Sequence, residues 1–101
     1  MLTIQVFEGS ATSTASIHAK VGKAIRVRIV GVPEDADGVK LTLVGANVSN
    51  EPVSASPVPG GEWKAVLPGG HFVSTGRALY AVSADIGSES VPLGDGSVFI
   101  D

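Results

Sequence analysis

Cysteine is absent from the 101-residue sequence, and tryptophan, tyrosine and methionine each occur once. Without cysteine the chain can form no disulfide, no thiolate metal site and no thiol nucleophile. The redox compartment therefore stays open, and the fold has to be stabilised by packing alone.

Long windows without a helix breaker are also scarce, because 13 glycines and 6 prolines are spread along the chain. The longest exception, Ser10–Val21, is rich in serine and threonine, and its apolar residues do not repeat at helical spacing. Fifteen valines and six isoleucines favour pleated, half-buried surfaces instead. The composition predicts an all-β protein, and the length suits a single domain over residues 1–101.

Concentrated charge of one sign is missing as well. Ten acidic and seven basic side chains give a net charge of −3, and they are scattered singly. No basic stripe is present that would neutralise phosphates, so nucleic acid is not expected as a partner. The amino-terminal MLTIQVFEGS has neither a basic start nor a continuous apolar run, so we expect no signal peptide and no transmembrane segment.

Alternation of apolar and polar residues predicts a series of short strands. It is clearest in Lys23–Gly31, where isoleucine and valine at every second position face inward and Arg26 and Arg28 face outward. The predicted strands are Leu2–Glu8, Ser16–Lys20, Lys23–Gly31, Val39–Leu43, Glu62–Leu67, Arg77–Ile86, Ser90–Leu93 and Ser97–Ile100, with a fragment at Ala46–Ser49.

Turn residues separate these runs. Pro33–Gly38 predicts a tight reversal, Asn50–Pro59 an exposed excursion, and Gly94–Gly96 a turn before the last strand. The Gly-Gly pairs at 60–61 and 69–70 each follow a proline. We interpret them as turns, since no helix follows either pair to hold a phosphate.

Seven to eight short strands, separated by turn residues at spacings of about eight to twelve residues, predict an antiparallel immunoglobulin-like β-sandwich. Trp63 and Tyr80 are expected in its core. Tyr80 also stands where such folds place a corner tyrosine, two positions before an inward residue. The paired cysteines of antibody domains are absent, so the prediction concerns topology.

Few residues suggest chemistry. His18 and His71 are far apart in the sequence, and neither has a second ligand at metal-binding spacing. Glu34, Asp35 and Asp37 partly match a calcium loop, but the later ligands and the bidentate glutamate are missing. We interpret the histidines as solvated surface residues and the three acids as part of an Asp-Gly turn.

Catalysis has little support in the sequence. No serine lies in a Gly-x-Ser-x-Gly elbow, and a hydrolase would have to combine a serine with His18 or His71 from separate loops. We expect no enzyme, no catalytic, cofactor-binding or metal-binding residue, and no cofactor. The outward cations, which include Arg26, Arg28, Lys20 and Lys40, are interpreted as a solvated sheet face.

A sugar-binding function stays open beside these interpretations. Trp63 and Tyr80, if they lie on the surface, would form a platform that stacks on a sugar ring. Ala65 and Leu67 share the predicted face of Trp63, which favours burial. A carbohydrate-binding or adhesion-type module is therefore the alternative function.

Three stretches of the second half carry a family resemblance. They read AVLPGG at Ala65–Gly70, STGRALYAVSAD at Ser74–Asp85 and PLGDGSVFID at Pro92–Asp101. This order resembles the small immunoglobulin-like domains at the amino ends of bacteriophage tail-fibre and baseplate proteins. Such domains show a strand ending in Leu-Pro, a glycine that opens a strand with an alternating tyrosine, and a Leu-Gly-x-Gly hairpin before the final strand.

The resemblance implies a non-enzymatic structural or interaction domain of a phage or prophage virion, as a tail-fibre, baseplate or decoration component. The implied partners are other virion or assembly proteins, with homo-oligomerisation through an uncovered edge strand as a further expectation. The implied location is the virion or the cytoplasm.

Overall fold

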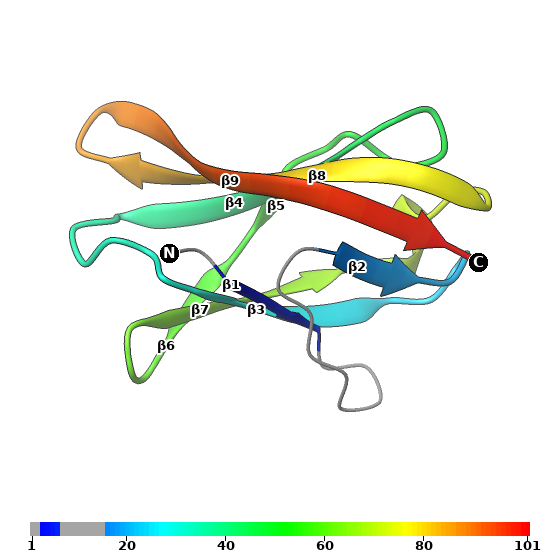
Figure 1. The fold of residues 1–101 in the computed structure, drawn as a ribbon. Helices are drawn as coiled ribbons and strands as arrows, with labels where there is room; N and C mark the ends of the chain where they lie inside the picture. Colours follow the sequence, from blue (N-terminus) through cyan, green and yellow to red (C-terminus); the bar gives the residue numbers. More distant parts are fainter. Residues whose placement is uncertain (1–2, 7–15) are drawn as a thin grey trace.

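A computed structural model describes residues 3–6 and 16–101, and within them it contains strands and one short 3-10 helix, η2 (Gly69–His71). The strands form two sheets that face each other (Figure 1). The first sheet contains, in spatial order, β1 (Thr3–Val6), β3 (Ile25–Val30), β7 (Glu62–Leu67) and β6 (Ser56–Val58). The second contains β2 (Ser16–Ala19), β9 (Glu89–Ile100), β8 (Gly76–Ile86), β4 (Gly38–Val44) and β5 (Val53–Ser54).

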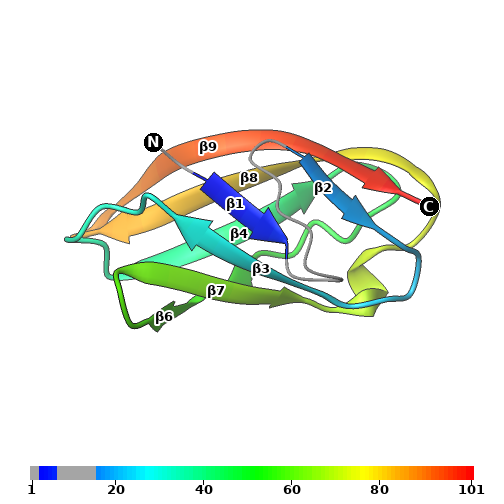
Figure 2. The ribbon, with the colours of Figure 1, turned by 60° about the horizontal axis from the view of Figure 1, so that its bottom comes forward.

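The core lies between these sheets and is built from the alternate residues that each strand turns inward. Figure 2 shows the first sheet in front of the long strands β8 and β9. Among the described residues no charged side chain is buried, and the core is apolar apart from the hydroxyl of Tyr80, so the sheets are joined by apolar contact. The buried residues are Ile17, Ala19, Ile25, Val27, Ile29, Val39, Leu41, Leu43, Val48, Ala65, Leu67, Phe72, Ala78, Tyr80, Val82, Ala84, Val98 and Ile100.

The predicted inward faces are confirmed in the described strands, although Trp63 and Ile86 are only partly buried against the core. Strands β2, β3, β7 and β8 begin and end within two residues of the predicted strands, and their apolar alternation coincides with the burial pattern. The first predicted strand, Leu2–Glu8, is described only over Thr3–Val6, and its other residues lie outside the described part of the chain. An all-β fold of two sheets is therefore established.

The expectation of purely antiparallel sheets is wrong, because β2 runs parallel to β9, with Ile17 beside Val98 and Ala19 beside Ile100. All other strand pairs in the described residues are antiparallel. By lying along β9, β2 covers backbone groups that would otherwise form an open sheet edge. The second sheet is therefore mixed. The sequence does not predict this, because alternation shows which face of a strand is buried but not the direction of the neighbouring strand.

The tight reversal predicted at Pro33–Gly38 is also wrong, since this segment carries the chain from the first sheet to the second. Ala36 N–H donates to the Pro33 carbonyl, which makes a turn, but Gly38 is already the first residue of β4. Asp37 N–H donates to the Asp85 carbonyl at 2.7 Å. This bond extends the pairing of β4 with β8, so the Asp-Gly pair continues a strand instead of forming a hairpin turn.

The excursion predicted over Asn50–Pro59 contains two short edge strands, β5 and β6. Pro57 lies in β6, at the edge of the first sheet, where a residue without an N–H group is tolerated. The strand fragment predicted at Ala46–Ser49 is reduced to one isolated bridge between Val48 and Phe72. Neither stretch is long enough for alternation to be read from its sequence.

The turn predicted at Gly94–Gly96 does not exist, because β9 runs without interruption from Glu89 to Ile100. Gly96 pairs with Tyr80 and Gly94 pairs with Val82, so each glycine stands opposite a larger residue of β8. The register then shifts between Val82 and Ser83, which marks a bulge in this ladder. The glycines therefore belong to an irregular strand and not to a turn.

The Pro68-Gly69-Gly70 break forms a close contact between two connections. Gly22 N–H donates to the Phe72 carbonyl, and Phe72 N–H donates to the Gly69 carbonyl. A Cβ atom on Gly69 would overlap the backbone carbonyl of Gly22, whereas one on Gly70 would meet nothing within 4 Å. The two adjacent glycines are therefore under different constraints.

We predict that Gly69→Ala destabilises the protein by about 1–3 kcal/mol, because the new methyl group forces the two backbones apart. Gly70→Ala is the matched control and should change the free energy of unfolding by less than about 0.5 kcal/mol. Urea unfolding of both variants measures the difference. Equal stabilities for the two variants would contradict the described packing of this turn.

Candidate functional site

The residues considered for catalysis and metal binding are distributed over separate elements. The ring of His18, on the outer face of β2, stacks on Phe99. His71 closes η2, and its backbone carbonyl accepts a hydrogen bond from Ser49 N–H. In the described part of the chain, no group of three or more histidine, aspartate or glutamate side chains is arranged to hold a metal ion.

Glu34, Asp35 and Asp37, which partly match a calcium loop in the sequence, lie in the connection between β3 and β4. The Asp37 carboxylate accepts a hydrogen bond from Gly87 N–H at 3.2 Å, which ties the β3–β4 connection to the β8–β9 turn. Glu34 and Asp35 are exposed in the turn that Pro33 and Ala36 close. Glu34 and Asp35 therefore lie in a turn, but the predicted Asp-Gly turn does not form, because Asp37 and Gly38 extend β4.

Trp63 and Tyr80 have different environments. Tyr80 is 2% exposed and lies in the core, which confirms the prediction for this residue and removes it from any surface platform. Trp63 is only partly buried at the edge of the core, in register with Ile29 of β3 and Pro57 of β6. Only Tyr80 is therefore a fully buried aromatic of the predicted pair.

Burial raises the pKa of Tyr80, and the negative charge of Asp95 on the paired strand raises it further. The folded state thus holds the phenolic proton more tightly than the unfolded chain, whose tyrosine pKa is about 10. The resulting stabilisation is complete below the unfolded pKa and is lost as the pH rises through the folded pKa.

We predict that the free energy of unfolding falls more steeply between about pH 9 and pH 11 in the wild type than in Tyr80→Phe, which has no proton to lose. Asp95→Asn should show an intermediate loss, because it removes only the smaller cause of the raised pKa. Urea unfolding as a function of pH measures all three. Identical pH profiles for wild type and Tyr80→Phe would contradict the burial of the phenol.

The described residues with the clearest capacity for binding lie on the outer face of the second sheet. We name the apolar strip as five residues on four adjacent strands: His18, Phe99, Arg77, Leu79 and Val44. His18 and Arg77 are both register partners of Phe99, from opposite sides, and Leu79 is the partner of Val44. The strip therefore crosses the sheet nearly perpendicular to its strands.

Three large apolar side chains of the strip face solvent. Leu79 is 51% exposed, Val44 48% and Phe99 38%. Each follows or precedes a buried residue in its strand, so the fold turns it outward while its neighbour fills the core. A row of exposed apolar side chains across one sheet is typical of a surface that a partner covers.

Polar side chains hold the aromatic part of the strip in place. The rings of His18 and Phe99 are stacked, with centroids 5.3 Å apart and an interplanar angle of 22°. The Arg77 guanidinium lies 5.7 Å from the Phe99 centroid, and its Nη2 donates to Ser97 Oγ at 3.1 Å. These contacts restrict the rotamers of Phe99 and Arg77 before a partner binds, so binding costs less side-chain entropy.

The sequence interpretation overlooked this strip, although part of its signal was present. Val44, Leu79 and Phe99 are large apolar residues at positions that the alternation assigns to the outer face. Their grouping was not visible, because it depends on β2, β9, β8 and β4 lying side by side in that order.

Comparison with solved structures finds similar folds at low sequence identity. A chain in the structure described as "Structural basis of T cell specificity and activation by the bacterial superantigen toxic shock syndrome toxin-1" has a TM-score of 0.58 and 7% identity, over 100% of both chains. An engineered protein has a TM-score of 0.55 and 12% identity, over 100% of this chain and 20% of that chain. At these identities the likeness concerns the fold alone.

CopC from Methylosinus trichosporium OB3b is also similar, with 13% identity over 86% of this chain and 84% of that chain, but its TM-score of 0.49 is too low to support an argument. No family model matches the sequence, and no curated protein matches it. Within residues 3–6 and 16–101, no helix has the length and hydropathy that a membrane span requires.

Proposed function

We propose that this chain is a non-enzymatic interaction domain of immunoglobulin-like type, which forms part of a phage or prophage virion and binds a neighbouring virion protein through the apolar strip. The observation that carries the proposal is the strip itself. It presents Leu79, Val44 and Phe99 to solvent on a rigid sheet, and folding does not require these side chains to be apolar.

The strand order supports the immunoglobulin-like part of the proposal. Such folds place strands A, B, E and D in one sheet and C, F and G in the other, with C′ added at the edge of the second sheet in the variable type. If β1 and β2 are the two halves of strand A, the order β1-β3-β7-β6 corresponds to A-B-E-D. The order β9-β8-β4-β5 then corresponds to G-F-C-C′.

The virion part of the proposal rests on the sequence resemblance in Ala65–Gly70, Ser74–Asp85 and Pro92–Asp101. The solved structures compared above are not described as phage proteins, so they add nothing to it. One element of the resemblance needs revision, since the Leu-Gly-Asp-Gly segment lies inside β9 and forms no hairpin.

A carbohydrate-binding or adhesion-type module is the alternative. Phe99 is the aromatic residue of the strip that a sugar would meet, and this residue is 38% exposed. His18 and Arg77 flank this ring on either side, so a sugar would contact its edge more readily than a free face. This arrangement favours a protein partner over a sugar.

We predict that Leu79→Asp weakens binding to the partner, sought among the proteins encoded next to this one, by about tenfold or more, because a charge enters the centre of an apolar contact. Val66→Asp is the matched control, since Val66 is also 51% exposed but lies in β7 of the other sheet. Biolayer interferometry with each purified neighbouring protein measures the affinities.

Both variants should unfold within about 0.5 kcal/mol of the wild type, because neither side chain contributes to the core. The proposal is contradicted if none of the neighbouring proteins binds, or if Leu79→Asp and Val66→Asp bind equally well. Binding to a glycan array that Leu79→Asp abolishes would support the alternative instead.

A further inference from the structure

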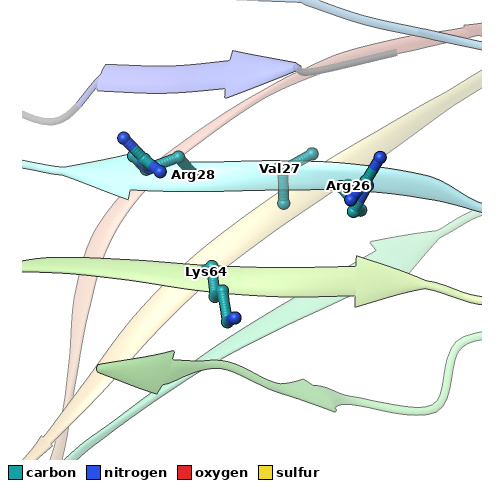
Figure 3. Close-up of a pocket in the computed structure, with 4 residues that line it drawn as sticks. All are labelled: Arg26, Val27, Arg28 and Lys64. Carbon is teal, nitrogen blue, oxygen red and sulfur yellow. The ribbon is translucent and has the colours of Figure 1, made fainter. Parts of the chain in front are cut away.

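The outer face of the first sheet carries a cationic trough, which we define by Arg26 and Arg28 of β3 and Lys64 of β7. These residues, with Val27, line a space of about 390 Å³ (Figure 3). In Figure 3 Arg26 and Arg28 lie along β3, and Lys64 extends from β7 away from β3. Arg26 and Arg28 were interpreted as parts of a solvated face, but the structure gathers them with a third cation.

This gathering is unfavourable within one molecule. Arg28 and Lys64 are direct cross-strand partners, and like charges in such pairs repel. Glu62 offsets part of the charge, with its Oε1 atom 3.1 Å from Arg28 Nη1. Arg26 and Lys64 have no carboxylate within ion-pair distance among the described residues. The trough therefore presents more positive charge than this part of the chain neutralises.

The rest of the molecule has the opposite charge. The three trough cations are part of seven basic residues, so four basic and ten acidic residues remain, which gives 4 − 10 = −6. Half of the ten acids lie in the β3–β4 connection or in the strand ends beside the β8–β9 turn, which Asp37 joins, and we name this set the acidic end. Its members are Glu34, Asp35, Asp37, Asp85 and Glu89.

The acidic end is a separate surface from the trough. Figure 1 and Figure 2 both show the β3–β4 connection and the β8–β9 turn together at one end of the molecule. Lys40 is the one cation that pairs with this set among the described residues, at 4.0 Å from Asp85. Glu34, Asp35, Asp37 and Glu89 are exposed.

We propose that the cationic trough binds the acidic end of a second copy of this chain, so that copies associate head to side. The contact joins two different surfaces, and each copy keeps one trough and one acidic end free for the next. Association of this kind produces rings or filaments and is weakened by salt. The trough lies on the opposite sheet from the apolar strip, so this inference goes beyond the proposed function and does not depend on it.

A charge-exchange experiment tests the proposal. Variant one, Arg26→Glu/Lys64→Glu, reverses the trough, and variant two, Glu34→Lys/Asp35→Lys/Glu89→Lys, reverses the acidic end, because only Asp37 and Asp85 of its five acids then remain. The wild type should show a concentration-dependent increase in mass by sedimentation velocity at about 20 mM salt, and this increase should disappear at about 500 mM salt. Each variant alone should stay monomeric, because its two surfaces then have the same sign.

An equimolar mixture of the two variants should associate again, because each trough then meets an end of opposite charge. Lys20→Glu/Lys23→Glu is the control for variant one, since it changes the net charge equally in the β2–β3 connection and should associate as the wild type does. Circular dichroism and urea unfolding should show that all of these variants fold.

Three results would overturn the proposal. The first is a wild type that remains monomeric at low salt up to about millimolar concentration. The second is a variant mixture that fails to associate although both variants fold. The third is trough-dependent binding of inorganic phosphate with no trough-dependent change in mass, which would make the trough a site for a small anion. None of these results affects binding through the apolar strip, which Leu79→Asp tests separately.

Discussion

The whole structure depends on the apolar contact between the two sheets. No disulfide can hold them, and among the described residues no charged side chain is buried between them. β8 is central to this contact, because it bonds to β4 on one side and β9 on the other while Ala78, Tyr80, Val82 and Ala84 face the first sheet. Gly94 and Gly96 of β9 lie opposite Val82 and Tyr80 of β8. In the longest ladder, the smallest residues of β9 therefore stand beside large residues of β8.

Because the inward residues fix the fold, the outward residues are free to serve binding. The outer faces of the two sheets differ in polarity: the second sheet carries the apolar strip, and the first carries the cationic trough. A domain with unlike surfaces on its two faces and a charged end is suited to contact more than one neighbour at a time. This property is what the proposed virion role and the proposed head-to-side contact have in common.

Much of this arrangement can be predicted from the sequence, because strand alternation has a physical cause. Ile25 and Ala78 face the core since they lie at alternate positions of apolar runs, and burial follows directly. Pairing does not follow in the same way. Which strands become neighbours decides the parallel pairing of β2, the crossing between sheets at Pro33–Gly38 and the uninterrupted β9. Gly94–Gly96 has the composition of a turn, but it is extended because it pairs with β8.

The candidate surfaces follow the same division. Exposed Leu79 and Val44 are visible in the sequence as apolar residues at outward positions, but their pairing across β8 and β4 is not. Likewise, Arg28 and Lys64 stand 36 positions apart in the chain and become neighbours only through the register of β3 and β7. The residues that form each candidate surface are therefore brought together by the order of the strands, and this order cannot be read from a short stretch of sequence.

Native-state hydrogen exchange tests the central claim that one apolar core joins both sheets. If it does, the slowest amides of β3 in the first sheet and of β8 and β9 in the second should exchange with the same opening free energy, equal to that of global unfolding. Protection should extend through Gly94–Gly96. Two separate opening free energies, one for each sheet, or rapid exchange at Gly94–Gly96 would contradict the account.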